Sequence, residues 1–161
     1  MQNLVFLNSK GRKDFLARLE SMYGFRGELH GHLMKGAKDK VYLLEDSEIV
    51  REGKDKSLRI DRVGLKIATE TAGGPRLNIE GSQLIGPDCS KRVLQIDHEH
   101  LQPLVKGEDF LLSDSELKQA GDNSGLFIIK LEKDYLGSGI VKDGRLLNQL
   151  SKIRRVKNLN N

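Results

Sequence analysis

The sequence predicts an α+β fold, in which an N-terminal α/β unit precedes a mostly β unit with one short helix. Three observations favour this class. An early segment has apolar residues at helical spacing, later segments have the apolar and polar alternation of strands, and turn formers separate them. The chain has 161 residues, of which 37% are hydrophobic and 31% charged, enough to fold around one large core or two small ones.

Residues 10–23 carry the clearest helical pattern, because apolar side chains recur there three or four positions apart. Asn8 or Ser9 can cap the N-terminus of this helix. Gly24 stands where many helices end in a left-handed residue. We therefore expect a helix over residues 10–23.

Residues 40–45, "KVYLLE", are rich enough in β formers to predict a short strand. The stretch "DSEIVREG", residues 46–53, then predicts one or two helical turns capped by Asp46 or Ser47.

A β-hairpin is predicted around the turn "AGGP", residues 72–75. Apolar and polar residues alternate on both sides of this turn, so one face of the hairpin should be buried. The apolar positions are Val63, Leu65 and Ile67 before the turn and Leu77 and Ile79 after it.

The segment "GPDCSK", residues 86–91, combines turn formers with little to bury and is the expected linker. The predicted domains are therefore residues 1–88 and residues 89–161.

Beyond the linker the pattern becomes mostly β. Residues 91–97 predict a strand, and "HEHLQPLVKGED" predicts a short helix ending at Gly107. Residues 125–147 predict two β segments around a turn at Gly137 and Gly139, with a third beyond the "KDG" turn. Short strands with one small helix favour a compact β-barrel over a sandwich.

Positive charge is concentrated at the C-terminal end. The chain carries +4 in total, yet its last 17 residues carry +5 and contain no Asp or Glu. The other residues sum to −1, so a basic segment follows a nearly neutral body. This distribution is typical of a protein with an anionic partner, nucleic acid first, although a solvated tail is an alternative.

No catalytic group of residues stands out. The Gly-x-Gly at Gly137 is followed by β formers and a second turn, so it does not lead into a helix N-terminus that could hold a phosphate. The single cysteine, Cys89, excludes an internal disulfide and a CxxC pair, and a structural thiol is expected there. We therefore expect a protein that is not an enzyme and has no cofactor.

Two H-x-H pairs leave a metal-dependent enzyme open as an alternative. His30 and His32 would share a face on a strand, whereas His98 and His100 would diverge at a helix start. No apolar run approaches the roughly 20 residues of a membrane-spanning helix. The cytoplasm is the expected location, with no membrane partner.

The order of several segments resembles that of the PUA-domain proteins. The segments are "EGSQLIGP", the strand, helix and glycine unit ending in "VKGED", and a late strand with "LGSGIV" before a basic segment. The family includes small Nip-type ribosome-assembly factors and modules associated with Nop/Sun-type RNA cytosine-5 methyltransferases. The resemblance implies an N-terminal pre-PUA domain followed by a C-terminal PUA-like pseudobarrel.

The resemblance also implies binding of structured RNA, either ribosomal or transfer RNA, in ribosome assembly or RNA modification. An RNA-modifying enzyme or an assembly factor would be the protein partner, and an accessory subunit of a separate RNA methyltransferase is the alternative role. In the family, the loop after the first helix and a glycine-bearing turn near the last strands approach RNA. Together with the charge pattern, this predicts an RNA-binding set of Lys91, Arg92, Lys106, Gly107, Gly137, Gly139, Lys142, Arg145, Lys152, Arg154, Arg155 and Lys157.

Overall fold

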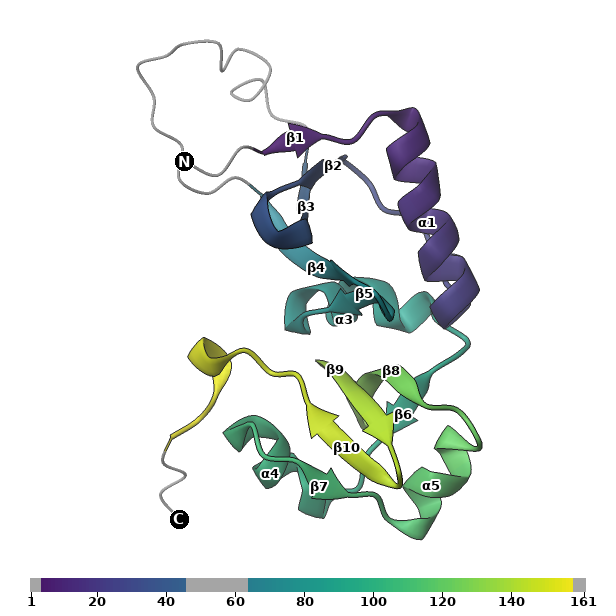
Figure 1. Cartoon of the computed structure of the whole chain (residues 1–161), viewed down its shortest axis with the longest axis vertical. Helices are drawn as coiled ribbons and strands as arrows, with labels where there is room; N and C mark the ends of the chain where they lie inside the picture. Colours follow the sequence, from purple (N-terminus) through teal and green to yellow (C-terminus); the bar gives the residue numbers. More distant parts are fainter. Residues whose placement is uncertain (1–3, 46–63, 158–161) are drawn as a thin grey trace.

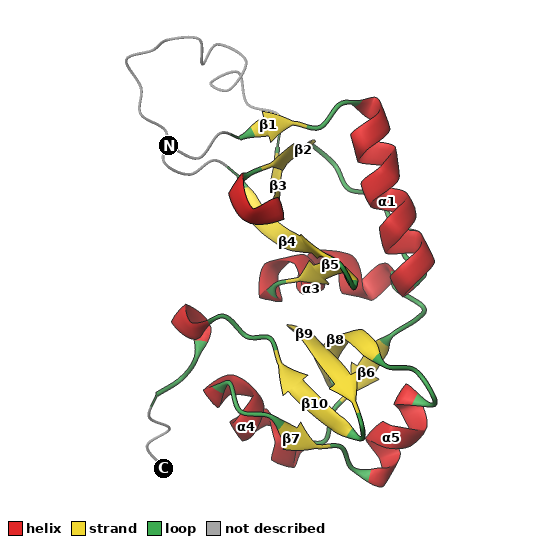
Figure 2. Cartoon of the chain, viewed as in Figure 1, coloured by secondary structure: helices red, strands yellow, loops and turns green. Residues whose placement is uncertain are grey.

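The protein is α+β in the computed structural model, which describes residues 4–45 and 64–157. Within these ranges it has two five-stranded sheets and four α-helices (Figures 1 and 2). The strand pairing leaves both sheets open in the described part of the chain, so the compact β-barrel predicted for the C-terminal half is not found there: its edge strands do not pair with each other. The predicted helical turns at residues 46–53 and the predicted strand residue Val63 lie outside the described residues.

The N-terminal sheet is antiparallel throughout, and its strands lie side by side in chain order. The helix α1 (Ser9–Tyr23) packs on one face of this sheet (Figure 1). The strands are β1 (Val5–Phe6), β2 (His32–Lys35), β3 (Lys40–Leu44), β4 (Leu65–Thr71) and β5 (Gly74–Leu77).

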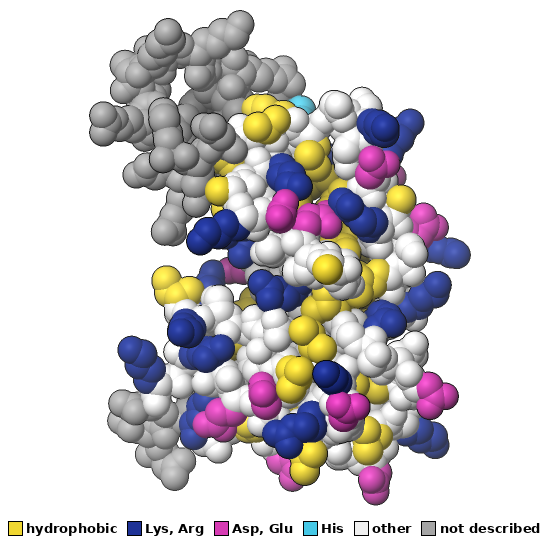
Figure 3. All heavy atoms as spheres, in the orientation of Figure 1, with side chains coloured by type: hydrophobic (Ala, Val, Ile, Leu, Met, Phe, Trp, Pro, Cys, Tyr) yellow, Lys and Arg dark blue, Asp and Glu magenta, His cyan; other side chains and the backbone are white. Residues whose placement is uncertain are grey.

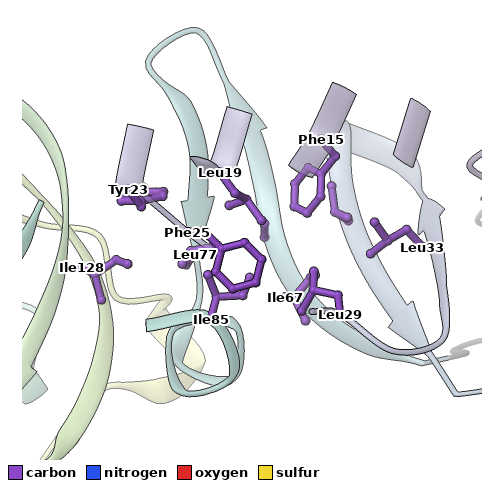
Figure 4. Close-up of a cluster of buried hydrophobic side chains, with 12 residues drawn as sticks. Phe15, Leu19, Tyr23, Phe25, Leu29, Leu33, Ile67, Leu77, Ile85 and Ile128 are labelled. Atoms are coloured by element: carbon purple, nitrogen blue, oxygen red, sulfur yellow. The ribbon is translucent and has the colours of Figure 1, made fainter. Parts of the chain in front are cut away.

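The helix predicted at residues 10–23 is confirmed as α1, with a start one residue earlier. The Asn8 side chain accepts a hydrogen bond from the Gly11 N–H and caps it, and Gly24 ends it with φ 64°. The side chains at positions 15, 19 and 23 are four residues apart, so they share one face and are almost fully buried. Figure 4 shows them packed toward the sheet and α3 (Ile79–Ile85), with Ile128 from the C-terminal half beside them.

The predicted hairpin is confirmed as β4 and β5, but Ile79 is not part of it. Ile79 is the first residue of α3 because the Asn78 side chain accepts from the Gly81 N–H and caps a helix there. The alternation along β4 is also interrupted, since the β3–β4 register shifts between Val41 and Tyr42.

The C-terminal sheet is mixed, because β6 pairs in parallel with β8 and the other neighbours are antiparallel. Two helices, α4 (Leu101–Lys106) and α5 (Asp114–Ala120), belong to this half, and a second apolar cluster forms its core. The strands, in spatial order, are β6 (Val93–Gln95), β8 (Gly125–Leu131), β9 (Asp134–Lys142), β10 (Arg145–Asn148) and β7 (Phe110–Leu111).

The turn predicted at Gly137 and Gly139 is wrong, since both residues lie inside β9. The chain reverses instead at Glu132, which has φ 51°. Gly137 takes φ 96°, and a Cβ on Gly139 would stand 2.6 Å from a methyl carbon of Leu146 on the next strand. These glycines therefore permit an unusual backbone angle and close strand packing. The predicted "KDG" turn is confirmed between β9 and β10.

The strand at residues 91–97 and the short helix ending at Gly107 are confirmed as β6 and α4. The helix α5 was not predicted. Ser113 and Glu116 form a capping box at its start, in which each side chain bonds to the other's backbone N–H.

The expected linker, residues 86–91, is packed against α1. Residues 86–88 form a 3-10 turn, and the N–H groups of Ser90 and Lys91 donate to the Tyr23 carbonyl at 3.0 and 2.9 Å. In the two described ranges, no helix combines the length and apolar character needed to cross a membrane.

Candidate nucleic-acid interface

The basic C-terminal segment, residues 149–157, is fixed to the body of the protein. The Val156 N–H donates to the Val105 carbonyl of α4 at 2.9 Å, and the Arg155 Nε donates to the Leu150 carbonyl at 3.1 Å. A 3-10 turn, Lys152–Arg154, lies between these contacts. The backbone of this segment, named here the basic tail, and the Arg155 side chain are therefore held in place.

Gly107 and Arg155, both predicted site residues, meet at the C-terminal end of α4. Gly107 ends the helix with φ 79°, and a Cβ there would lie 2.2 Å from the Arg155 Nε. The positive φ favours glycine at this position, and a Cβ would also displace the Arg155 guanidinium from the helix end. Lys106 immediately precedes Gly107 and is half-buried. The structure thus brings Lys106, Gly107 and Arg155 together.

Arg154 reaches across to the N-terminal half of the chain. Its guanidinium forms an ion pair with Glu80, which lies in the first turn of α3. Beside this contact, Arg76 of β5 donates to the Gln149 side chain at 2.8 Å. The basic tail is therefore attached to both halves of the molecule. Lys152 and Lys157 stay exposed.

Lys142 and Arg145 form a separate group. They are direct cross-strand partners on either side of the Asp143–Gly144 turn. Both side chains are exposed, and this turn lies near α5, at the opposite end of β10 from the basic tail (Figure 1). The predicted cations therefore fall into two groups rather than one.

Gly137 and Gly139 are buried and do not offer a surface for RNA. The Gly137 N–H donates to the Ser82 hydroxyl of α3 at 2.8 Å, and Gly139 is covered by Leu146. The backbone approach to RNA that was expected at these glycines is therefore not available.

Lys91 and Arg92 are neighbours with different surroundings. Lys91 is exposed, whereas the Arg92 guanidinium donates to the Ser124 carbonyl at 2.8 Å and lies 5.4 Å from the centre of the Phe127 ring. Arg92 also has a left-handed backbone, with φ 52°. These contacts give Arg92 a structural role at the start of β6.

Cations that the sequence pattern did not single out lie on the neighbouring strands β3, β4 and β5 of the N-terminal sheet: Lys40, Lys66 and Arg76. Figure 3 shows Lys and Arg side chains gathered on the left side of the molecule, at the level where the two sheets meet. A strand register could have revealed this group, but the register depends on a β-bulge that no local sequence signal marks.

The histidine pairs do not converge on a metal site in the described residues. His98 lies 3.0 Å from a Glu132 carboxylate oxygen, whereas the His100 Nδ1 lies 2.7 Å from buried Glu116. The His100 ring also stacks on Phe110. The two side chains of the "HEH" pair thus have different partners.

A grouping of Ser, His and carboxylate side chains at the start of α5 serves to hold helices together. The Ser113 hydroxyl donates to the Asp97 carboxylate at 2.5 Å, not to His100. Glu116 accepts from the backbone N–H groups of Asp97 and Ser113, both at 2.8 Å. This network ties the start of α5 to the turn before α4.

Cys89 is half-buried and donates to the Ile85 carbonyl at 3.2 Å. Burial, with a smaller contribution from Asp88, raises the pKa of the Cys89 thiol to about 12. A thiol that stays protonated is a weak nucleophile and metal ligand.

Comparison with protein-family models gives no match to this chain. A search among curated proteins gives none either.

Proposed function

We propose that the protein binds structured RNA without catalysing a reaction, and that the basic tail is the main contact. The observation that carries the proposal is the anchoring of this tail to α4 through the Val156 N–H and to α3 through the Arg154 guanidinium. A solvated tail would have no need of these contacts.

Fixed cations suit a folded anionic partner. Phosphate contacts from Lys and Arg supply most of the affinity for nucleic acid, and each ordered side chain lowers the entropy lost on binding. The exposed cations Lys152 and Lys157 lie beside Arg154, and residues 145–161 contain no Asp or Glu to oppose them. A structured RNA presents phosphates at fixed spacing and would match such a surface.

The proposed identity is a PUA-type RNA-binding protein that acts on ribosomal or transfer RNA in the cytoplasm. Support comes from the order of segments in the sequence and from a C-terminal half that combines short strands with a small helix ending at Gly107. In this proposal residues 1–88 form the pre-PUA domain, residues 89–161 the PUA-like domain, and the C-terminal sheet corresponds to the family's pseudobarrel.

The test compares two double variants of the full chain. Lys152→Gln with Arg154→Gln removes two cations from the basic tail, and the control Lys10→Gln with Lys13→Gln removes two exposed cations from α1. Filter binding to a tRNA transcript is measured at several salt concentrations, and circular dichroism checks the fold.

We expect the tail variant to bind about tenfold more weakly or worse, with a salt slope lower by roughly one to two units. The control should change little. Equal binding by the two variants, or no binding by the unmodified protein, would overturn the proposal.

A further inference from the structure

Three adjacent strands of the N-terminal sheet carry a row of side chains with a polar residue at its centre. Lys40 on β3 pairs with Thr69 on β4, and Thr69 pairs with Arg76 on β5. Directly paired residues lie on the same face of a sheet. The next row of pairs, Val41, Ala68 and Leu77, is buried in the core toward α1. Lys40, Thr69 and Arg76 therefore lie on the face that α1 does not cover.

A β-bulge adds Lys66 to this face. Strict alternation would place Lys66 on the same side as Ala68, in the core. Ile67 has no partner at the register shift, and both Ile67 and Ala68 are fully buried, so one extra residue is inserted there. The insertion reverses the alternation, and Lys66 pairs with Tyr42 on the outer face.

The electrostatics agree with this placement. Burial, followed by the charges of Lys40 and then Arg76, lowers the pKa of Lys66, while Glu80 opposes the change. The carboxylate of Glu80 is itself paired with Arg154. In the described residues neither Lys40 nor Lys66 forms an ion pair. Among the described residues, the charge of Glu80 therefore opposes three cations on this face.

We propose that Lys40, Lys66, Thr69 and Arg76 bind a phosphate group of the RNA, which gives the protein a second anchor in its N-terminal half. This inference rests on the proposed RNA-binding function. Two ammonium groups, a planar guanidinium and a hydroxyl supply the donors that phosphate oxygens accept. An anion here also relieves the repulsion among the three cations.

We expect the bound phosphate group to belong to the RNA rather than to a separate small anion, because the site adjoins the basic tail. Arg76 donates a hydrogen bond to Gln149 at the start of the tail. Glu80 lies close enough to Lys66 to affect its pKa, and the same carboxylate pairs with Arg154 of the tail. A single RNA backbone could pass from the tail to this face without leaving positive surface.

The experiment compares the double variant Lys40→Gln with Lys66→Gln against the control Lys10→Gln with Lys13→Gln. The control also removes two lysines, from the helix α1 on the opposite side of the same sheet. Binding of a tRNA transcript is measured against salt. In parallel, the backbone amides of Lys66, Thr69 and Arg76 are followed by NMR in the unmodified chain during titration with tRNA and with inorganic phosphate.

We expect the Lys40/Lys66 variant to bind tRNA about tenfold more weakly with a salt slope lower by roughly one to two units, while the control changes little. The amides should shift with tRNA. Lys66→Gln should also raise the melting temperature, because it removes a charge that the fold disfavours, so unfolding would not explain the weaker binding.

The other outcomes separate the two proposals. In one outcome, tRNA binding depends on the basic tail, but the Lys40/Lys66 variant binds as well as the control. This result would overturn the second anchor and leave the proposed RNA-binding function in place. Amide shifts with inorganic phosphate in a chain that does not bind tRNA would overturn the RNA-binding function and assign the face to a free phosphate. The absence of shifts with either probe would overturn the site.

Discussion

The backbone N–H of Gly137 in β9 donates a 2.8 Å hydrogen bond to the hydroxyl of Ser82 in α3. Ser82 is fully buried, and its own hydroxyl proton goes to the Ile79 carbonyl at 2.7 Å. One side chain therefore satisfies a backbone donor of the C-terminal sheet and an acceptor of the N-terminal half. A glycine with positive φ presents the N–H at this point.

We predict that Ser82→Ala destabilises the protein by about 1–3 kcal/mol, because it leaves the buried Gly137 N–H without an acceptor. Urea denaturation followed by circular dichroism measures the change. Ser21→Ala, at an exposed position of α1, is the control and should have little effect. Equal unfolding midpoints for the two variants would show that this hydrogen bond contributes nothing to stability.

Arg92 and Lys91 offer a test of structural against binding roles. Arg92→Ala removes a hydrogen bond to Ser124 and the contact with Phe127, so we expect a loss of about 1–2 kcal/mol in the free energy of unfolding. Lys91→Ala should leave stability unchanged because its side chain is exposed. Thermal melts check both. An Arg92→Ala variant of normal stability and weaker tRNA binding would place Arg92 in the interface instead.

Cys89 should react slowly in the folded protein. Alkylation requires the thiolate, and burial raises the pKa of this thiol from 9.0 to about 12, so the thiolate fraction at pH 8 falls about a thousandfold. We expect alkylation by iodoacetamide at pH 8 to be slower by about this factor than in urea-unfolded protein. Comparable rates in the two states would contradict the raised pKa.

The same shift makes stability depend on pH. The unfolded thiol ionises near pH 9 while the folded one stays protonated, so this contribution to stability is complete below about pH 9. It is lost as the pH rises from about 9 to about 12. Unfolding free energies measured across this range should fall less steeply for Cys89→Ser, which does not ionise there.

Elements with strong local signals could be predicted from the sequence. Asn8 and Gly24 cap α1 at its two ends, Gly107 ends α4 in a left-handed conformation, and the turn before Gly144 joins two strands. In each case a few neighbouring residues determine the backbone. The capping box of Ser113 and Glu116 that starts α5 is also a local signal of this kind.

Features that depend on distant residues could not be predicted. The glycines of β9 gave a turn signal, yet Gly139 is required by Leu146 on the neighbouring strand. The bulge that turns Lys66 outward depends on how β3 pairs with β4. The contact between Glu80 and Arg154 joins residues 74 positions apart, so the charge of the tail could be predicted from the sequence but its place on the protein could not.

Glu80 provides a further test because it is an acidic residue beside an otherwise cationic surface. Its carboxylate pairs with Arg154 and lies close enough to Lys66 to affect its pKa. In Glu80→Gln the amide keeps the size of the side chain and removes the negative charge. We therefore expect tRNA to bind several-fold more tightly, because a negative charge that repels the phosphates of the RNA is lost.

The matched control is Glu20→Gln on α1, which removes one exposed carboxylate on the far side of the sheet and raises the net charge by the same amount. Titration of both variants with a tRNA transcript separates a local effect from a general gain in positive charge. Equal affinities would attribute the gain to net charge alone. Weaker binding by Glu80→Gln would contradict the prediction. It would show that the ion pair with Arg154 positions the basic tail for RNA, and that this gain in affinity is larger than the loss caused by repulsion between Glu80 and the phosphates.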